Sequence, residues 1–186
     1  MRTVTYGAAC SLDGFIAGPE GSIDWLHFSK DVQDVMGKYW STVDTMLMGR
    51  KTWEVAVASS GGGRKGKRAN SKRREKAPAV RSYVFSRTLE EIDAPGVELV
   101  RENAGEFVRE LKSRPGRGIC VMGGGILARS LFEAGVIDEV GLNVHPILLG
   151  AGIPLFLDAG RRIPLELLES RTIDGGCVLS SYRVVP

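Results

Sequence analysis

Apolar and polar positions along the chain follow two periods, which predict strands and helices that alternate. Short apolar runs and a period of two are typical of strands, whereas apolar residues spaced three and four apart are typical of a half-buried helix. Strands are expected at residues 3–10, 45–48, 82–86, 96–100, 118–122 and 139–144. Helices are expected at residues 29–41, 104–113 and 126–133, and another begins within residues 49–54. Ser29 is a good N-cap for the first helix, and Gly135 stops the last one.

The end of the chain has a different pattern. Residues 165–174 and 177–184 are two strand-like segments joined by Gly175 and Gly176, which is typical of an antiparallel hairpin. The alternation of strands and helices before it predicts a mainly parallel sheet with helices on both faces. We therefore expect a single three-layer α/β domain over residues 1–186 that ends in an antiparallel hairpin.

Composition is consistent with one domain. The chain has 186 residues, 43% of them hydrophobic, which suffices for one core. It contains neither an apolar run of about 20 residues nor the apolar stretch of a signal peptide. Three cysteines, Cys10, Cys120 and Cys177, lie in apolar surroundings and favour reduced thiols. We expect a cytoplasmic protein, and the two histidines and scattered cysteines predict no metal site.

The net charge of +3 is unevenly distributed. Residues 64–76 hold eight basic residues and one acidic residue, so this segment carries +7 and the rest of the chain −4. Residues 59–78 are rich in Gly, Ser, Lys and Arg and nearly free of apolar side chains, which predicts a flexible loop. Such a loop could bind nucleic acid through phosphate contacts. It lacks the aromatic side chains that stack on bases, so nucleic-acid binding is only the alternative from another functional class.

Three consecutive glycines follow the strand expected at 118–122. A strand, a glycine turn and a helix start bring free backbone N–H groups and the helix dipole to one point, which favours an anion. Gly123, Gly125 and Ala128 also satisfy a loose dinucleotide-binding pattern. A Rossmann domain requires an acidic residue at the end of the next strand, where this chain has Asn143. The glycines alone are equally compatible with a turn that binds nothing.

Four segments, which occur in a fixed order along the chain, help to decide whether the glycine turn binds a ligand. They are residues 8–17 (Ala-Ala-Cys-Ser-Leu-Asp-Gly-Phe-Ile-Ala), 48–54 (Met-Gly-Arg-Lys-Thr-Trp-Glu), 84–88 (Val-Phe-Ser-Arg-Thr) and 122–125 (Met-Gly-Gly-Gly). Together they resemble the dihydrofolate reductase superfamily, from residue 3 to about residue 184. The first segment and residues 145–156 (His-Pro-Ile-Leu-Leu-Gly-Ala-Gly-Ile-Pro-Leu-Phe) look more like its riboflavin-biosynthesis branch. That branch is the C-terminal reductase domain of RibD, which also occurs as stand-alone proteins.

The resemblance implies an NADPH site. Gly123 and Gly124 would meet the pyrophosphate, across a cis peptide bond. Ser86 and Arg87 would hold the adenosine 2′-phosphate, since a phosphate dianion requires charged partners. Ala9 and Ile16 would contact the nicotinamide. The full set of expected cofactor residues is Ala9, Ile16, Gly49, Arg50, Lys51, Thr52, Ser86, Arg87, Gly123, Gly124, Gly125 and Ile126.

The resemblance also implies an activity, hydride transfer from NADPH to a pyrimidine-like substrate, as in 5-amino-6-(5-phosphoribosylamino)uracil reductases. Dihydrofolate, another heterocycle or a xenobiotic compound is the alternative substrate on the same fold. Reduction also requires a proton, for which the candidates are Asp13, at the end of the first strand, and Asp34, on the first long helix. Asn143 is expected to hydrogen-bond the substrate. A homodimer is expected from the resemblance alone.

Overall fold

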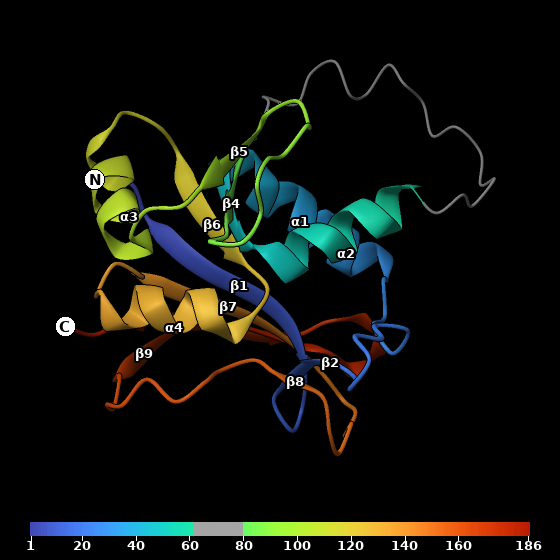
Figure 1. Ribbon diagram of the computed structural model, residues 1–186. Coiled ribbons are helices and arrows are strands. Elements are labelled where there is room, and N and C mark those ends of the chain that lie inside the picture. Colours follow the sequence, from blue (N-terminus) through green and yellow to red (C-terminus); the bar gives the residue numbers. More distant parts are fainter. Residues whose placement is uncertain (62–79) are drawn as a thin grey trace.

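The computed structural model describes residues 1–61 and 80–186, and its centre is an eight-stranded sheet (Figure 1). Along the sheet the strand order is β5-β4-β3-β6-β1-β7-β10-β9. The strands are β1 (Val4–Ser11), β3 (Val43–Gly49), β4 (Arg81–Phe85), β5 (Val97–Val100), β6 (Gly118–Met122), β7 (Glu139–His145), β9 (Leu165–Thr172) and β10 (Val178–Val184). β10 runs antiparallel to both of its neighbours, β7 and β9, and the other strand pairs of this sheet within the described residues are parallel. The expected mainly parallel sheet with a C-terminal hairpin is confirmed.

Within the described residues, four helices cover the two faces of the sheet. They are α1 (Lys30–Thr42), α2 (Arg50–Gly61), α3 (Ala104–Ser113) and α4 (Gly125–Glu133). Helices α1 and α2 lie on one side, and α3 and α4 lie on the other (Figure 1). Right-handed crossovers require this division, because α1 and α2 lead toward β4 while α3 and α4 lead back toward β7. The result is the three-layer dihydrofolate reductase-like fold.

The two faces of β1 have different environments. Val4 and Tyr6 are fully buried in the core beneath α3 and α4. Because strand residues alternate between faces, Thr5, Gly7 and Ala9 point to the opposite side, where they line a cleft. One face of the sheet therefore supplies the core, and the other supplies the floor of a site.

Local sequence signals predicted most element boundaries to within about two residues. Helix α3 and strand β6 have the expected bounds, and the Ser29 Oγ accepts the Val32 N–H at 3.2 Å as the N-cap of α1. Gly135, with φ of +65°, follows α4 as expected. Two very short strands, β2 (Phe15–Ala17) and β8 (Ile153–Pro154), were not expected. They form a separate two-stranded sheet, and a two- or three-residue strand is too short to show a period.

The expected basic loop needs one correction. Residues 59–61 continue α2 instead of beginning a loop. The rest of the loop, with its basic segment at 64–76, lies outside the described residues. None of the helices in the described ranges has the length and apolarity needed to cross a membrane.

Candidate functional site

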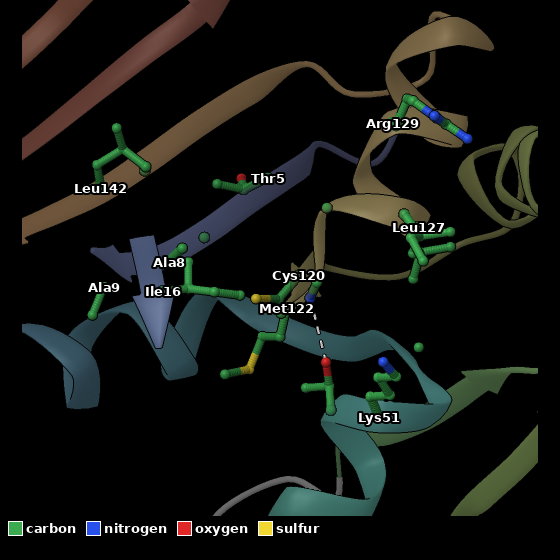
Figure 2. Close-up of a pocket in the computed structure, with 18 of the residues that line it drawn as sticks. Thr5, Ala8, Ala9, Ile16, Lys51, Cys120, Met122, Leu127, Arg129 and Leu142 are labelled. Carbon is green, nitrogen blue, oxygen red and sulfur yellow. Dashed lines mark hydrogen bonds between the residues drawn. The ribbon is translucent and has the colours of Figure 1, made fainter. Parts of the chain in front are cut away.

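A cleft of about 1710 Å³ runs along the carboxyl ends of the central parallel strands. Figure 2 shows Ala9 and Ile16 toward one end of this space and Lys51 and Arg129 toward the other. Every expected cofactor residue lines it, namely Ala9, Ile16, Gly49, Arg50, Lys51, Thr52, Ser86, Arg87, Gly123, Gly124, Gly125 and Ile126. Residues from four separate segments of the sequence are thus brought to one surface. This position, where crossovers leave β1 and β6 in opposite directions, is where open α/β sheets bind ligands.

The glycine turn after β6 fits closely against α2. Gly123 has a φ of +83°, in the region that favours glycine, and a Cβ there would overlap the Thr52 side chain. The Gly124 N–H donates to the Thr52 Oγ1 at 3.4 Å. The expected cis bond between Gly123 and Gly124 is wrong, because no described peptide bond is cis. The positive φ of Gly123 turns the chain instead.

Two glycines at this point border open space. A Cβ at Gly49 or at Gly124 would meet no atom within 4 Å. Gly125 differs, since a Cβ there would lie 2.8 Å from Leu157 Cγ. Gly124 is the N-cap of α4 and supplies no side-chain hydrogen bond to the helix, so the first N–H groups of α4 have no side-chain cap.

The N-termini of α2 and α4 therefore converge. Helix α2 begins at Arg50, directly after β3, and its Thr52 touches the turn that opens α4. Each N-terminus carries a partial positive charge and unpaired N–H groups. The open glycines leave room for a phosphate at this junction, and the geometry suits a pyrophosphate.

Cations surround the same end of the cleft. The Nε of Arg50 forms an ion pair with the Oε1 of Glu54 at 3.5 Å, and the Nη1 of Arg50 donates to the Thr88 Oγ1 at 3.3 Å. Lys51 and Arg87 are exposed, and neither forms an ion pair with another residue in the described ranges. These side chains are available to an anionic ligand.

The turn after β4 holds Arg87 in place. The Ser86 Oγ accepts the N–H groups of Thr88 and Leu89 at 3.2 and 3.0 Å, so this hydroxyl caps the turn. Thr88 also lines the cleft beside Arg87, and the sequence reasoning did not select it. A hydroxyl three residues after the end of a strand was the available signal.

At the other end, the backbone of Ala9 is open to the cleft. The Ile119 N–H on β6 donates to the Thr3 carbonyl at 2.9 Å, and backbone direction alternates along a parallel strand. Odd-numbered residues of β1 therefore point toward β6. The pairing of β1 with β6 ends at Gly7 and Met122, whereas the pairing of β1 with β7 continues to Ser11 and His145. The Ala9 N–H and carbonyl thus face the gap that opens after β6 turns away.

The structure places the two carboxylate candidates outside the residues that line the cleft. The Asp13 carboxylate accepts the Leu149 and Gly150 N–H groups at 3.2 and 2.8 Å, and the Ser11 hydroxyl at 2.6 Å. The hydrogen bond from Ser11 is the main reason that the pKa of Asp13 is lowered. Asp34 is exposed on α1, away from the cleft-lining residues of that helix. Asp13 holds two loops together, and Asp34 does not reach the site.

Asn143 does line the cleft, as expected, and it belongs to a polar cluster that sequence reasoning missed. Its Nδ2 lies 3.2 Å from the Nε2 of His145, and its Oδ1 is buried without a hydrogen-bond partner. The Nδ1 of His145 lies 3.4 Å from both the His27 N–H nitrogen and the Cys177 Sγ. Burial lowers the pKa of His145, as does His27 beside it. Burial also raises the pKa of the Cys177 thiol.

Comparison with known proteins supports this architecture. The model of the RibD C-terminal domain family matches residues 2–179. The protein YyaP of Bacillus subtilis is 33% identical over 188 residues, covering 98% of this chain and 95% of its own length. A putative riboflavin biosynthesis protein from Shewanella has a similar structure, with a TM-score of 0.80 at 24% identity and full coverage of both chains.

Two further structures share the fold at lower identity. One is a deaminase and 5-amino-6-(5-phosphoribosylamino)uracil reductase from Thermotoga maritima, with a TM-score of 0.69 at 18% identity, covering 99% of this chain and 57% of that one. The other is a dihydrofolate reductase from Enterococcus faecalis, solved with NADP(H), with a TM-score of 0.67 at 16% identity and coverage of 99% and 97%.

Proposed function

Because this chain belongs to the RibD C-terminal domain family, we propose that it is an NADPH-dependent reductase of a pyrimidine-like heterocycle. The observation that carries the proposal is the junction at Gly124, where two helix N-termini meet at a glycine with open space on its outer side. The cleft extends from this junction to the open backbone of Ala9. A dinucleotide likewise has an anionic pyrophosphate, which would lie at the junction, and an uncharged carboxamide, which would lie at Ala9.

The residues at the junction suit a pyrophosphate. The N–H groups at the start of α4 and the N-terminal turn of α2 donate hydrogen bonds, and Lys51 adds a positive charge nearby. A side chain at Gly49 or Gly124 would occupy the space that the phosphates need. NADPH bound here would supply the hydride for the reaction.

The turn after β4 would determine the choice between NADPH and NADH. Arg87 and Arg50 lie with the hydroxyl of Thr88 on the rim of the cleft. A 2′-phosphate dianion there would gain charge-assisted hydrogen bonds that a 2′-hydroxyl cannot make. Arginine suits this role because its guanidinium remains charged and donates in two directions.

The opposite end would hold the nicotinamide and the substrate. The free N–H and carbonyl of Ala9 match the donor and acceptor of a carboxamide, and Ile16 lines the adjacent wall. The cleft exceeds the 300–1,000 Å³ or so that a drug-sized ligand fills. It has room for a second ring beside Ala9. A pyrimidine is proposed for it because the chain belongs to the RibD C-terminal domain family and shares its fold with the Thermotoga 5-amino-6-(5-phosphoribosylamino)uracil reductase.

Reduction of dihydrofolate is the less favoured alternative. The fold is shared with the Enterococcus dihydrofolate reductase. A carboxylate on the first long helix would be needed to hold a pterin-like ring. Asp31 and Asp34 are the acidic residues of α1, and neither lines the cleft. The polar residue at the substrate end is Asn143 instead.

Fluorescence titration of the purified chain tests the cofactor assignment. NADPH should quench tryptophan emission and bind at least tenfold more tightly than NADH, because only NADPH carries the 2′-phosphate. Oxidation of NADPH at 340 nm, followed across pyrimidine, pterin and quinone substrates, then identifies the acceptor class. Absent or equal binding of the two cofactors would contradict the proposal.

A further inference from the structure

Three side chains form a continuous polar chain that leads from the substrate end of the cleft into the protein. Asn143 and His145 follow one another on the same face of β7, and Cys177 lies just before β10. His145 and Cys177 are almost completely buried. The edge of the Trp25 ring stands against the His145 ring, with the centroids 5.3 Å apart. This imidazole is therefore held in one orientation.

The neighbours of His145 determine which ring nitrogen carries the proton. The backbone N–H of His27 points at Nδ1 from 3.4 Å, and a backbone N–H can only donate. The Cys177 Sγ lies 3.4 Å from the same atom. Burial raises the pKa of this thiol and keeps its proton on sulfur, so it can share the acceptor to which the His27 N–H donates. Nδ1 must accept, and the neutral ring therefore carries its proton on Nε2.

This tautomer determines the orientation of the Asn143 amide. The Nε2–H donates, so the atom of Asn143 that faces it at 3.2 Å must be an acceptor, which is Oδ1. The amide oxygen and nitrogen exchange places by a half turn about the last side-chain bond, and hydrogen bonding decides between the two orientations. With Oδ1 on His145, the amide Nδ2 occupies the buried position that has no partner in the protein.

The Asn143 Nδ2 group at this position has no acceptor in the protein, so a bound ligand is needed to provide one. The position is shielded from bulk water, and an unsatisfied buried N–H is unfavourable because it has lost its hydrogen bonds to water. Asn143 lines the cleft and is the direct partner of Ala9 across the β1–β7 pairing. A ring that enters beside Ala9 is the group placed to supply the acceptor.

We propose that His145 and Cys177 are positioning residues that make Asn143 a hydrogen-bond donor to a ring carbonyl, so that the site selects oxo-substituted over amino-substituted heterocycles. This inference rests on the proposed function for the identity of the site as the substrate end of a reductase. It adds the chemical feature by which the substrate is chosen. An amino group at the same ring position would place its N–H donors against the Asn143 Nδ2 donor, and no hydrogen bond would form.

Two ligands of equal shape test the proposal. Lumazine carries oxo groups at positions 2 and 4 of the pteridine ring, whereas 2,4-diaminopteridine carries amino groups there, so turning the ring over does not exchange one pattern for the other. Calorimetric titration of the intact chain, with and without NADP⁺, measures both dissociation constants. Lumazine should bind roughly tenfold more tightly, the factor expected for one matched against one mismatched hydrogen bond.

Three variants distinguish an effect on the choice between the two pteridines from an effect on the stability of the protein. Asn143→Asp presents only acceptors and should reverse the preference. His145→Phe removes the Nε2–H, so the amide can turn and the preference should fall to within about twofold. Cys177→Ser keeps a donor to Nδ1 and should retain the native preference. Thermal unfolding and NADPH affinity serve as controls, because a merely structural role would not change the ratio of the two dissociation constants.

The outcomes distinguish this proposal from the function on which it rests. Failure to bind NADPH would contradict the proposed function, while the ligand ratio measured without cofactor would still decide the role of Asn143. A native preference for the diamino ring would overturn the inference, as would binding of neither ring. If His145→Phe does not fold, an unchanged preference in Asn143→Asp is sufficient to overturn it.

Discussion

Ala9 on β1 and Asn143 on β7 are direct partners in the parallel pairing of the two strands. Neighbouring strands lie about 4.8 Å apart, so Ala9, whose free backbone groups face the β6 side, and Asn143 are close neighbours that both line the cleft. In the proposed reductase these two residues hold the nicotinamide and the substrate ring. Hydride transfer requires the reacting atoms to approach to about 3–3.5 Å, and this pairing brings the two binding groups into the same region.

Arg87→Ala should weaken NADPH binding roughly tenfold or more and leave NADH binding unchanged, because only NADPH offers a 2′-phosphate to the guanidinium. Fluorescence titration of both cofactors measures the effect. Arg162→Ala is the control, since Arg162 is exposed and does not line the cleft. Equal losses for both cofactors would show that Arg87 maintains the turn after β4.

Gly124→Ala should reduce affinity for both NADPH and NADH without loss of stability. The Gly124 backbone, with φ of −55°, accommodates alanine, and the added Cβ would enter the open space assigned to the pyrophosphate. Gly37→Ala on α1 is the matched control, since its Cβ also meets no atom within 4 Å. That change should leave cofactor binding intact and stabilise the helix by about 0.5–1 kcal/mol. Unchanged affinity in Gly124→Ala would show that the pyrophosphate does not bind next to Gly124.

Asp13→Asn should destabilise the protein at neutral pH, because an amide cannot accept all the hydrogen bonds that the carboxylate receives. The pKa of Asp13 lies below its ordinary value of 3.8, so its stabilising effect is present above that pH. The effect is lost as the pH falls through the folded-state pKa. Urea unfolding at pH 7 and at about pH 2–3 should show a difference between native and variant that shrinks in acid.

The same variant also tests Asp13 as a proton donor. Asp24→Asn changes another exposed carboxylate outside the cleft and should have no comparable effect on stability. If Asp13→Asn abolishes NADPH oxidation while the protein remains folded, the carboxylate takes part in the reaction and the structural role assigned to it is incomplete.

Asp34→Asn should leave kcat/KM within about twofold of the native value. This side chain is exposed on α1, and Val35, Met36 and Tyr39 of the same helix line the cleft instead. Steady-state kinetics with the best substrate from the panel provide the measurement. A loss of a hundredfold or more would restore Asp34 as the proton donor and require α1 to turn when substrate binds.

Sequence patterns predicted the helices and the main strands to within about two residues, and the residues expected at the cofactor line one cleft. Ser29, Gly135 and the three glycines are short-range signals, because a cap or a turn depends on a few neighbouring residues. The cofactor residues are recognisable for a related reason. Each lies where a strand ends and a helix or turn begins, and parallel strands bring those ends to one edge.

The substrate end could not be predicted in the same way. Asp13 was a reasonable proton donor until the fold brought it to the N–H of Gly150, 137 residues away. Such contacts depend on strand register and loop packing, which no local pattern records.

The sequence by itself determined the layered α/β fold and the family of the chain, and it singled out the residues proposed to bind the phosphates, because these follow from local periodicity and from motifs at strand ends. Only the tertiary structure placed the His27 backbone and the Cys177 thiol on one nitrogen of His145. That contact joins three distant segments, and it decides which atom of Asn143 is free because a hydrogen-bond acceptor can be assigned only when its donors are in place.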